Sequence, residues 1–151
     1  MFIVVSNRLP LSRGVNGSLI PSSGGLASAF ASVRDGGLDF IWVGSWESVD
    51  AETDARVRQE LGDKFSPVFI EKQMYKLYYD TFANDVMWPI LHFEESKSLE
   101  SAEIGKAWDA YKFVNEKFAQ VIAGVVAPTG AAPNACDIMV NDCECLVVIT
   151  S

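Results

Sequence analysis

Short apolar runs alternate with helix-like segments along this chain, and that alternation constrains the fold more than any other feature. Phe2-Ile3-Val4-Val5 and Phe40-Ile41-Trp42-Val43 are apolar at every position, which is typical of strands buried on both faces. Segments 65–70 and 137–142 are predicted to be further strands. We therefore expect one α/β domain over residues 1–151, with a mostly parallel sheet that binds ligands at the carboxyl ends of its strands.

Helices are expected between these strands. The predicted helices cover about 25–33, 51–61, 71–83 and 101–126. Apolar residues recur every three or four positions in the last of these, which predicts a core-facing stripe rather than a cofactor site. Its members are Trp108, Tyr111, Val114, Phe118, Val121, Ile122 and Val125. Residues 9–23 are expected to form a loop or small hairpin in which Asn16-Gly17 signals a type I′ turn.

A candidate anion site lies near the start of the chain. The first apolar run ends in Ser6-Asn7-Arg8, and the chain re-enters a predicted helix at Gly24-Gly25. Glycines let backbone N–H groups approach a ligand, and a helix N-terminus adds a partial positive charge. An arginine can hold an anionic group through two parallel hydrogen bonds. Arg8, Gly24 and Gly25 are therefore candidates for binding a phosphate or diphosphate, although each also has an ordinary structural reading.

Composition excludes several classes of function. The net charge of −8 argues against a nucleic-acid partner, which would need a basic face. No apolar run approaches the roughly 20 residues that span a bilayer, and no secretory signal is recognisable, so we expect a cytoplasmic protein without a membrane partner. Cys136, Cys143 and Cys145 are odd in number and clustered, which disfavours a disulfide framework. Their spacing is not that of a standard zinc site, so we expect no metal.

A series of motifs, in this order and at compatible spacing, resembles one family. The segments are Val4-Val5-Ser6-Asn7-Arg8-Leu9-Pro10, Ser23-Gly24-Gly25-Leu26, Tyr78-Tyr79-Asp80-Thr81-Phe82-Ala83-Asn84, Trp88-Pro89-Ile90-Leu91-His92-Phe93, and Trp108-Asp109-Ala110-Tyr111 with Val114-Asn115. Together they resemble the N-terminal part of the trehalose-6-phosphate synthases, the UDP-glucose-dependent retaining enzymes of glycosyltransferase family 20. The resemblance implies GT-B architecture, in which two Rossmann-like domains face a cleft and glucose passes from UDP-glucose to glucose 6-phosphate. It implies no cofactor.

The resemblance also implies roles for particular residues. Arg8 and the Gly24-Gly25 turn would lie near the phosphates of donor and acceptor. Tyr79 and Trp88 match the pair that holds the acceptor sugar phosphate, and Asp142 matches an aspartate at the acceptor hydroxyls. These residue types suit a sugar phosphate, because phenol and guanidinium groups donate to phosphate while aromatic rings and carboxylates receive a sugar. In isolation, Tyr79 and Trp88 would be read as core aromatics, and His92 as a structural residue rather than a general base.

The sequence departs from the family pattern near its end. Where the family motif continues Asp-Tyr-His-Leu, this chain reads Asp142-Cys143-Glu144-Cys145-Leu146. The 151 residues hold no counterpart of the C-terminal nucleotide-sugar domain, so we expect a partial, acceptor-side domain that does not transfer glucose alone. The apolar run at 146–151 would then favour a homo-oligomer or pairing with a full-length synthase subunit.

Two other functions remain open on the sequence. The chain could be a non-catalytic module that binds a sugar phosphate or regulates a full-length synthase. It could also be an unrelated α/β nucleotide-binding protein, although neither Gly-x-Gly-x-x-Gly nor the P-loop pattern occurs. Convergence of the matching segments on one site would disfavour the last reading.

Overall fold

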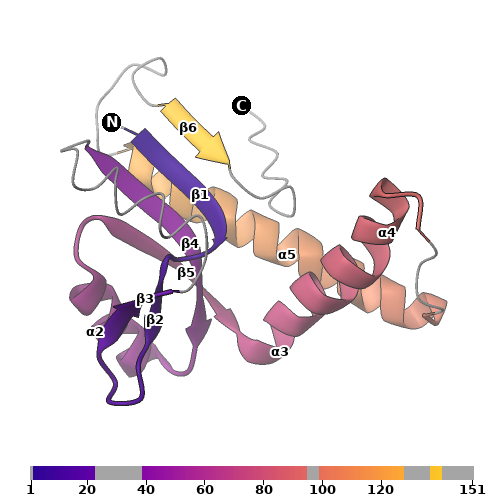
Figure 1. The fold of residues 1–151 in the computed structure, drawn as a ribbon, viewed down its shortest axis with the longest axis horizontal. Helices are drawn as coiled ribbons and strands as arrows, with labels where there is room; N and C mark the ends of the chain where they lie inside the picture. Colours follow the sequence, from indigo (N-terminus) through magenta and orange to yellow (C-terminus); the bar gives the residue numbers. More distant parts are fainter. Residues whose placement is uncertain (1, 23–38, 95–98, 128–136, 141–151) are drawn as a thin grey trace.

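A four-stranded parallel sheet organises the structure, a computed structural model that describes residues 2–22, 39–94, 99–127 and 137–140. Its strands are β1 (Phe2–Arg8), β4 (Phe40–Ser48), β5 (Phe65–Glu71) and β6 (Asp137–Val140). They stand in the order β5-β4-β1-β6, and every neighbouring pair is parallel (Figure 1). The predicted α/β class with a parallel sheet is therefore confirmed.

The order of the strands creates a topological switch point beside β1. The chain moves outward from β1 through β4 to β5 and later returns to the opposite side of β1 as β6. The direction of winding therefore changes between β1 and β6. In open α/β sheets, ligands bind outside the carboxyl ends of the strands at such a switch point. Arg8, the last residue of β1, lies at this point.

Helix α5 (Ser101–Val126) covers one face of the sheet. Alternate strand residues point to opposite faces, so Ile3 and Val5 pack toward α5 while Val4 points the other way. From α5, the buried stripe consists of Ala107, Ala110, Tyr111, Val114, Phe118 and Ile122. Tyr111, Val114, Phe118 and Ile122 confirm the predicted core face of this helix. The prediction was wrong for Trp108, which is 44% exposed because it lies on the part of α5 that projects beyond the sheet, and Val121 and Val125 are only half-buried. In Figure 1 the N-terminal half of α5 projects beyond the sheet.

The opposite face packs against α2 (Ala51–Leu61) and the hairpin of β2 (Leu11–Arg13) and β3 (Leu19–Pro21). Asp50 caps α2 by accepting a 2.8 Å hydrogen bond from the Thr53 backbone N–H. The second apolar cluster on this face comprises Val4, Leu9, Phe40, Trp42, Val57 and Leu61. The two clusters hold β1 and β4 between them, which explains why both strands read as continuous apolar runs.

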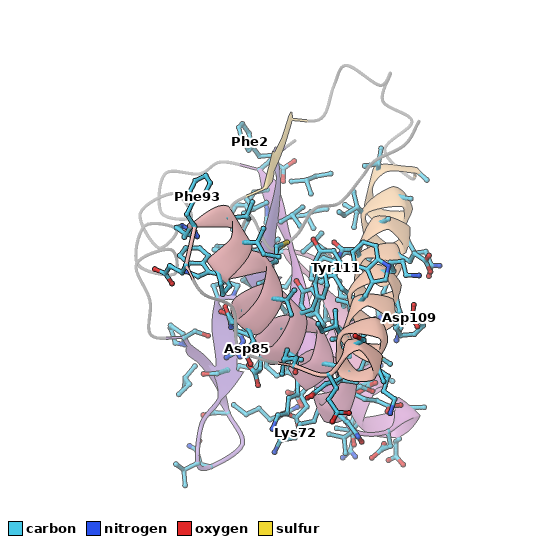
Figure 2. The ribbon with its side chains drawn as sticks, turned by 90° about the vertical axis from the view of Figure 1, so that its right-hand side faces the viewer. Phe2, Lys72, Asp85, Phe93, Asp109 and Tyr111 are labelled. Carbon is cyan, nitrogen blue, oxygen red and sulfur yellow. The ribbon has the colours of Figure 1, made fainter. Side chains whose placement is uncertain are left out.

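A helical segment, residues 72–91, follows β5 and differs most from expectation. It consists of α3 (Lys72–Tyr75), η1 (Lys76–Met87) and α4 (Trp88–Leu91), and η1 is a π-helix. The helix predicted for about 71–83 is present but continues further, and most of it is wider than an α-helix. The segment leaves the sheet and crosses the projecting part of α5 (Figure 1). In the turned view, Lys72 lies at its start and Phe93 just beyond its end (Figure 2).

Smaller corrections concern the hairpin and β4. The predicted type I′ turn at Asn16-Gly17 is wrong, because only Gly17 has a positive φ, of 80°, and the turn closes through a 2.9 Å hydrogen bond from Gly17 N to Gly14 O. Strand β4 continues beyond the apolar run Phe40-Ile41-Trp42-Val43 that predicted it and ends at Ser48. The helix predicted for about 25–33 lies outside the described residues.

Candidate functional site

The carboxyl end of β1 forms a polar corner that is anchored to β4. The indole N–H of Trp42 donates a buried 2.7 Å hydrogen bond to Ser6 Oγ, and Ser6 Oγ donates to the carbonyl of Arg8 at 2.6 Å. Gly44 lets the two backbones approach, since a Cβ there would lie 2.6 Å from Leu9 N and 2.7 Å from Arg8 C. The parallel register shifts between Val5 and Arg8, so the corner turns away from the regular ladder. These contacts fix the backbone that carries Arg8.

The Arg8 guanidinium rests against two tyrosines of the helical segment. Its Nε donates a 2.8 Å hydrogen bond to Tyr75 Oη. Its Cζ lies 4.9 Å from the Tyr75 ring centroid and 5.7 Å from that of Tyr79. The same phenol oxygen accepts a 3.0 Å hydrogen bond from Nδ2 of the buried Asn7. Residues at the end of β1 and in the helical segment that follows β5 thus meet in one cluster.

The electrostatics of this cluster suit an anion. The hydrogen bond with Tyr75 raises the pKa of Arg8 above its usual value, so the guanidinium stays charged. Burial raises the pKa of Tyr75 to about 12, so its phenol is neutral at physiological pH and does not repel an anion. The corner therefore combines a fixed positive charge with neutral aromatic walls.

Tyr79 and Trp88 lie on the same helical segment, nine positions apart. Nine positions make about two turns of a helix with i→i+5 hydrogen bonds, but about two and a half turns of an α-helix. Tyr79 lies within the π-helix η1 and borders Arg8, and Trp88 is the first residue of α4. Trp88 is 41% exposed, and its indole stacks on the His92 ring with centroids 3.7 Å apart.

Comparisons with known proteins identify the family. The sequence model of glycosyltransferase family 20 matches residues 1–148. The chain belongs to glycosyltransferase family 20. It is 36% identical over 137 residues to a bifunctional trehalose-6-phosphate synthase/phosphatase of Thermoproteus tenax, covering 83% of this chain and 18% of that protein. It is also 36% identical over 134 residues to alpha,alpha-trehalose-phosphate synthase [UDP-forming] A of Dictyostelium discoideum, covering 83% of this chain and 17% of the relative.

A solved structure shares the fold of this family 20 chain. It is described as "Trehalose-6-phosphate from E. coli bound with UDP-2-fluoro glucose", and it superposes with a TM-score of 0.57 at 21% identity. The match covers 95% of this chain and 28% of that one. The resemblance inferred from the sequence motifs is confirmed, as is the fold class, part of a GT-B glycosyltransferase. The chain spans less than a third of the length of the relatives described here.

The structure brings together some of the predicted site residues of this family 20 chain. Arg8 and Tyr79 are in contact, and Trp88 lies further along the helical segment that carries Tyr79. Gly24, Gly25 and Asp142 lie outside the described residues, as do the three cysteines. The role of each of these residues stays a prediction.

Tyr75 and Asn7 are the residues of this cluster that sequence reasoning missed. From sequence alone, Tyr75 is one of several aromatic positions, with Tyr78, Tyr79 and Phe82, on the helix expected over about 71–83. The available signal was its spacing, because it precedes Tyr79 by four positions and so lies one helical turn away. Asn7 stood inside the Ser-Asn-Arg motif but had no assigned partner.

A groove between η1 and α5 is distinct from the Arg8 corner. It has a volume of about 430 Å³ and shares no residue with the Arg8 contacts described above. Its lining residues are Phe82, Met87, Trp108, Tyr111, Lys112, Asn115, Glu116 and Ala119. Figure 2 shows Tyr111 directed between the two helices and Asp109 directed away from them. The groove is therefore mainly a gap in the aromatic packing between η1 and α5.

Residues 2–22, 39–94, 99–127 and 137–140 contain no group of three or more His, Cys, Asp or Glu side chains arranged to hold a metal ion. None of the helices in those ranges is long and apolar enough to cross a bilayer.

Proposed function

We propose that this chain forms the acceptor side of an alpha,alpha-trehalose-phosphate synthase and binds glucose 6-phosphate at the Arg8 corner. In this proposal, Arg8 holds the phosphate, while Tyr79 and Trp88 line the sugar. Gly24 and Gly25 would supply backbone N–H groups to a phosphate of donor or acceptor, and Asp142 would accept from the acceptor hydroxyls. The partners are glucose 6-phosphate and UDP-glucose.

The observation that carries the proposal is the contact of Arg8 with Tyr75 and Tyr79 at the carboxyl end of β1. A guanidinium fixed beside neutral phenols at a topological switch point is suited to a small phosphorylated ligand. Family membership supplies the ligand class, since the relatives described above are named for trehalose-phosphate synthesis.

We further propose that residues 1–151 act as one acceptor-side domain with no glucosyl transfer of their own. The supporting fact is length, because the chain covers only 17–18% of the two synthases described above. A complete GT-B site forms between two domains, so transfer would require a nucleotide-sugar domain in addition to residues 1–151. A cytoplasmic location belongs to the same proposal, because sugar phosphates are cytoplasmic metabolites.

Calorimetric titration tests the binding part of the proposal. The purified chain is titrated with glucose 6-phosphate, glucose and inorganic phosphate. We expect millimolar or tighter binding of glucose 6-phosphate, and a loss of at least about 50-fold in the Arg8→Ala variant, because the phosphate loses its paired charge. Arg56→Ala is the matched control, since Arg56 is exposed on α2 and pairs only with Glu52 at 3.7 Å among the described residues.

Two outcomes would contradict the proposal. Equal affinity of the Arg8→Ala and Arg56→Ala variants would show that binding does not use the β1 corner. UDP release from UDP-glucose by the chain alone, dependent on glucose 6-phosphate and lost in Arg8→Ala, would show that the chain needs no second domain.

A further inference from the structure

A hydrogen bond at the Nε edge of the Arg8 guanidinium sets the orientation of the group. A guanidinium has one N–H on Nε and four on its two Nη atoms. Arg8 Nε–H donates a hydrogen bond to Tyr75 Oη at 2.8 Å. Within the described ranges, no hydrogen bond from the Nη groups accompanies it. The Nε edge is thus committed to the protein, and the Nη edge is the one left to meet a ligand.

The phenol that accepts this bond is itself held in place. Asn7 Nδ2 donates to the same oxygen at 3.0 Å, and Asn7 is only 6% exposed. The Tyr75 ring also packs against its neighbours, with centroids 5.9 Å from Tyr78 and 5.4 Å from Tyr79. A ring fixed by an amide from β1 and by two rings from η1 has little freedom to follow a moving arginine.

We propose that Tyr75 is a positioning residue, which holds Arg8 by its Nε edge so that the Nη edge faces the phosphate of the acceptor. Without the phenol oxygen, the long arginine side chain would sample several rotamers and would lose entropy on binding. This inference rests on the proposed function, because it assumes that Arg8 binds a phosphate. It assigns Tyr75 no contact with the substrate.

The neutral state of Tyr75 supports this role. Burial raises its pKa to about 12, so the phenol keeps its proton at any physiological pH. A neutral oxygen orients the guanidinium without cancelling its charge, whereas a carboxylate in the same place would neutralise it. The geometry thus leaves Arg8 both fixed in direction and fully available as a cation.

The Tyr75→Phe variant tests the inference, because it keeps the ring and removes only the oxygen. The first measurement is the proton exchange rate of the Arg8 Nε–H in the NMR spectrum of the full chain. We expect exchange to accelerate about tenfold when this hydrogen bond is lost. Tyr111→Phe is the matched control, because Tyr111 also packs against η1 but makes no contact with Arg8 in the described residues.

The second measurement separates positioning from a structural role. Affinity for glucose 6-phosphate should fall about tenfold in Tyr75→Phe, while affinity for glucose should not change. A structural role would weaken both ligands together and would lower thermal stability, as a fold defect does. An Asn7→Ser variant provides a second route, since it loosens the phenol without touching its ring, and should give a smaller change in the same direction.

The results distinguish this inference from the function on which it rests. If the wild-type chain does not bind glucose 6-phosphate, the proposed function fails and the role of Tyr75 in it fails too. If the wild type binds but Tyr75→Phe leaves the Nε–H exchange or the affinity unchanged, only the positioning role is overturned. A slower Nε–H exchange in Tyr75→Phe would also overturn it.

Discussion

The helical segment 72–91 presents similar aromatic residues on two sides that behave differently. On one side, Tyr78 is fully buried and lies 5.8 Å from the Tyr111 ring of α5, while Phe82 lies 4.8 Å from the same ring. On the other side, Tyr75 and Tyr79 contact the guanidinium of Arg8. The first side is a packing interface between helices, and the second borders a charge at the edge of the sheet.

The difference lies in the partner rather than in the ring. Rings against rings exclude water and contribute through buried area and edge contacts. Rings against a guanidinium keep part of the cation exposed, which a ligand can then use. Substitutions on the packing side should therefore change stability first, and substitutions on the Arg8 side should change binding first.

The largest expected effect comes from the packing side. Tyr78→Ala should lower the free energy of unfolding by about 3–5 kcal/mol, because it leaves a cavity among η1, α5 and the sheet. Urea denaturation followed by circular dichroism measures it. Tyr79→Ala, on the Arg8 side, should cost less than half as much. Equal losses in the two variants would abolish the distinction between the sides.

The next prediction concerns a variant that disturbs the carboxyl end of β1 and leaves the ring packing between η1 and α5 unchanged. Gly44→Ala places a Cβ within 2.7 Å of the Arg8 backbone, so the end of β1 must move. We expect a loss of roughly 2–3 kcal/mol in stability. We also expect loss of glucose 6-phosphate binding even where the variant is folded. Gly105→Ala is the control, since nothing lies within 4 Å of a Cβ at that position. A folded Gly44→Ala variant with wild-type affinity would show that the position of the β1 end does not matter for binding.

The sequence predicted much of the scaffold and less of the site. Continuous apolar runs predicted the parallel strands, and the three- and four-residue spacing from Tyr111 to Ile122 predicted the core face of α5, because both patterns follow from burial. The spacing of Tyr79 and Trp88 was read as a family motif and not as geometry. No local signal distinguishes a π-helix from an α-helix, so the π-helical form of η1 could not be foreseen.

The sequence did not predict Tyr75 as part of the cluster for a different reason. Tyr75 acts on Arg8 across 67 positions of sequence, and a hydrogen bond of that separation depends on how β5 and β1 are placed in the sheet. Residue type and spacing carry no such information for a single chain. The place of Arg8 at the carboxyl end of a buried parallel strand was predictable, because the apolar run before it marks that strand. Its role in binding a ligand stays a prediction.

A change of cation sharpens the comparison on the Arg8 side. Arg8→Lys keeps the charge but removes Nε, the planar fork and the bond to Tyr75. We expect glucose 6-phosphate affinity to fall roughly 10- to 100-fold, with stability changed by less than about 0.5 kcal/mol because Arg8 is exposed. Calorimetry and thermal unfolding of the same samples measure the two quantities. A lysine variant that binds as well as the wild type would mean that charge alone, and not direction, serves the ligand.

The smallest expected effect is a dependence of stability on alkaline pH. The pKa of Tyr75 is raised from 10.0 to about 12 by burial, so the folded state retains a proton that the unfolded state loses. This contribution is complete below pH 10 and is lost as the pH rises toward 12. The raised pKa corresponds to at most about 2.7 kcal/mol, and partial exposure reduces the expected loss to about 1 kcal/mol. Urea midpoints at pH 9 and 11 should therefore differ more for the wild type than for Tyr75→Phe. The same difference in both proteins would show that other groups cause the alkaline loss and that the Tyr75 phenol is not held in its neutral form.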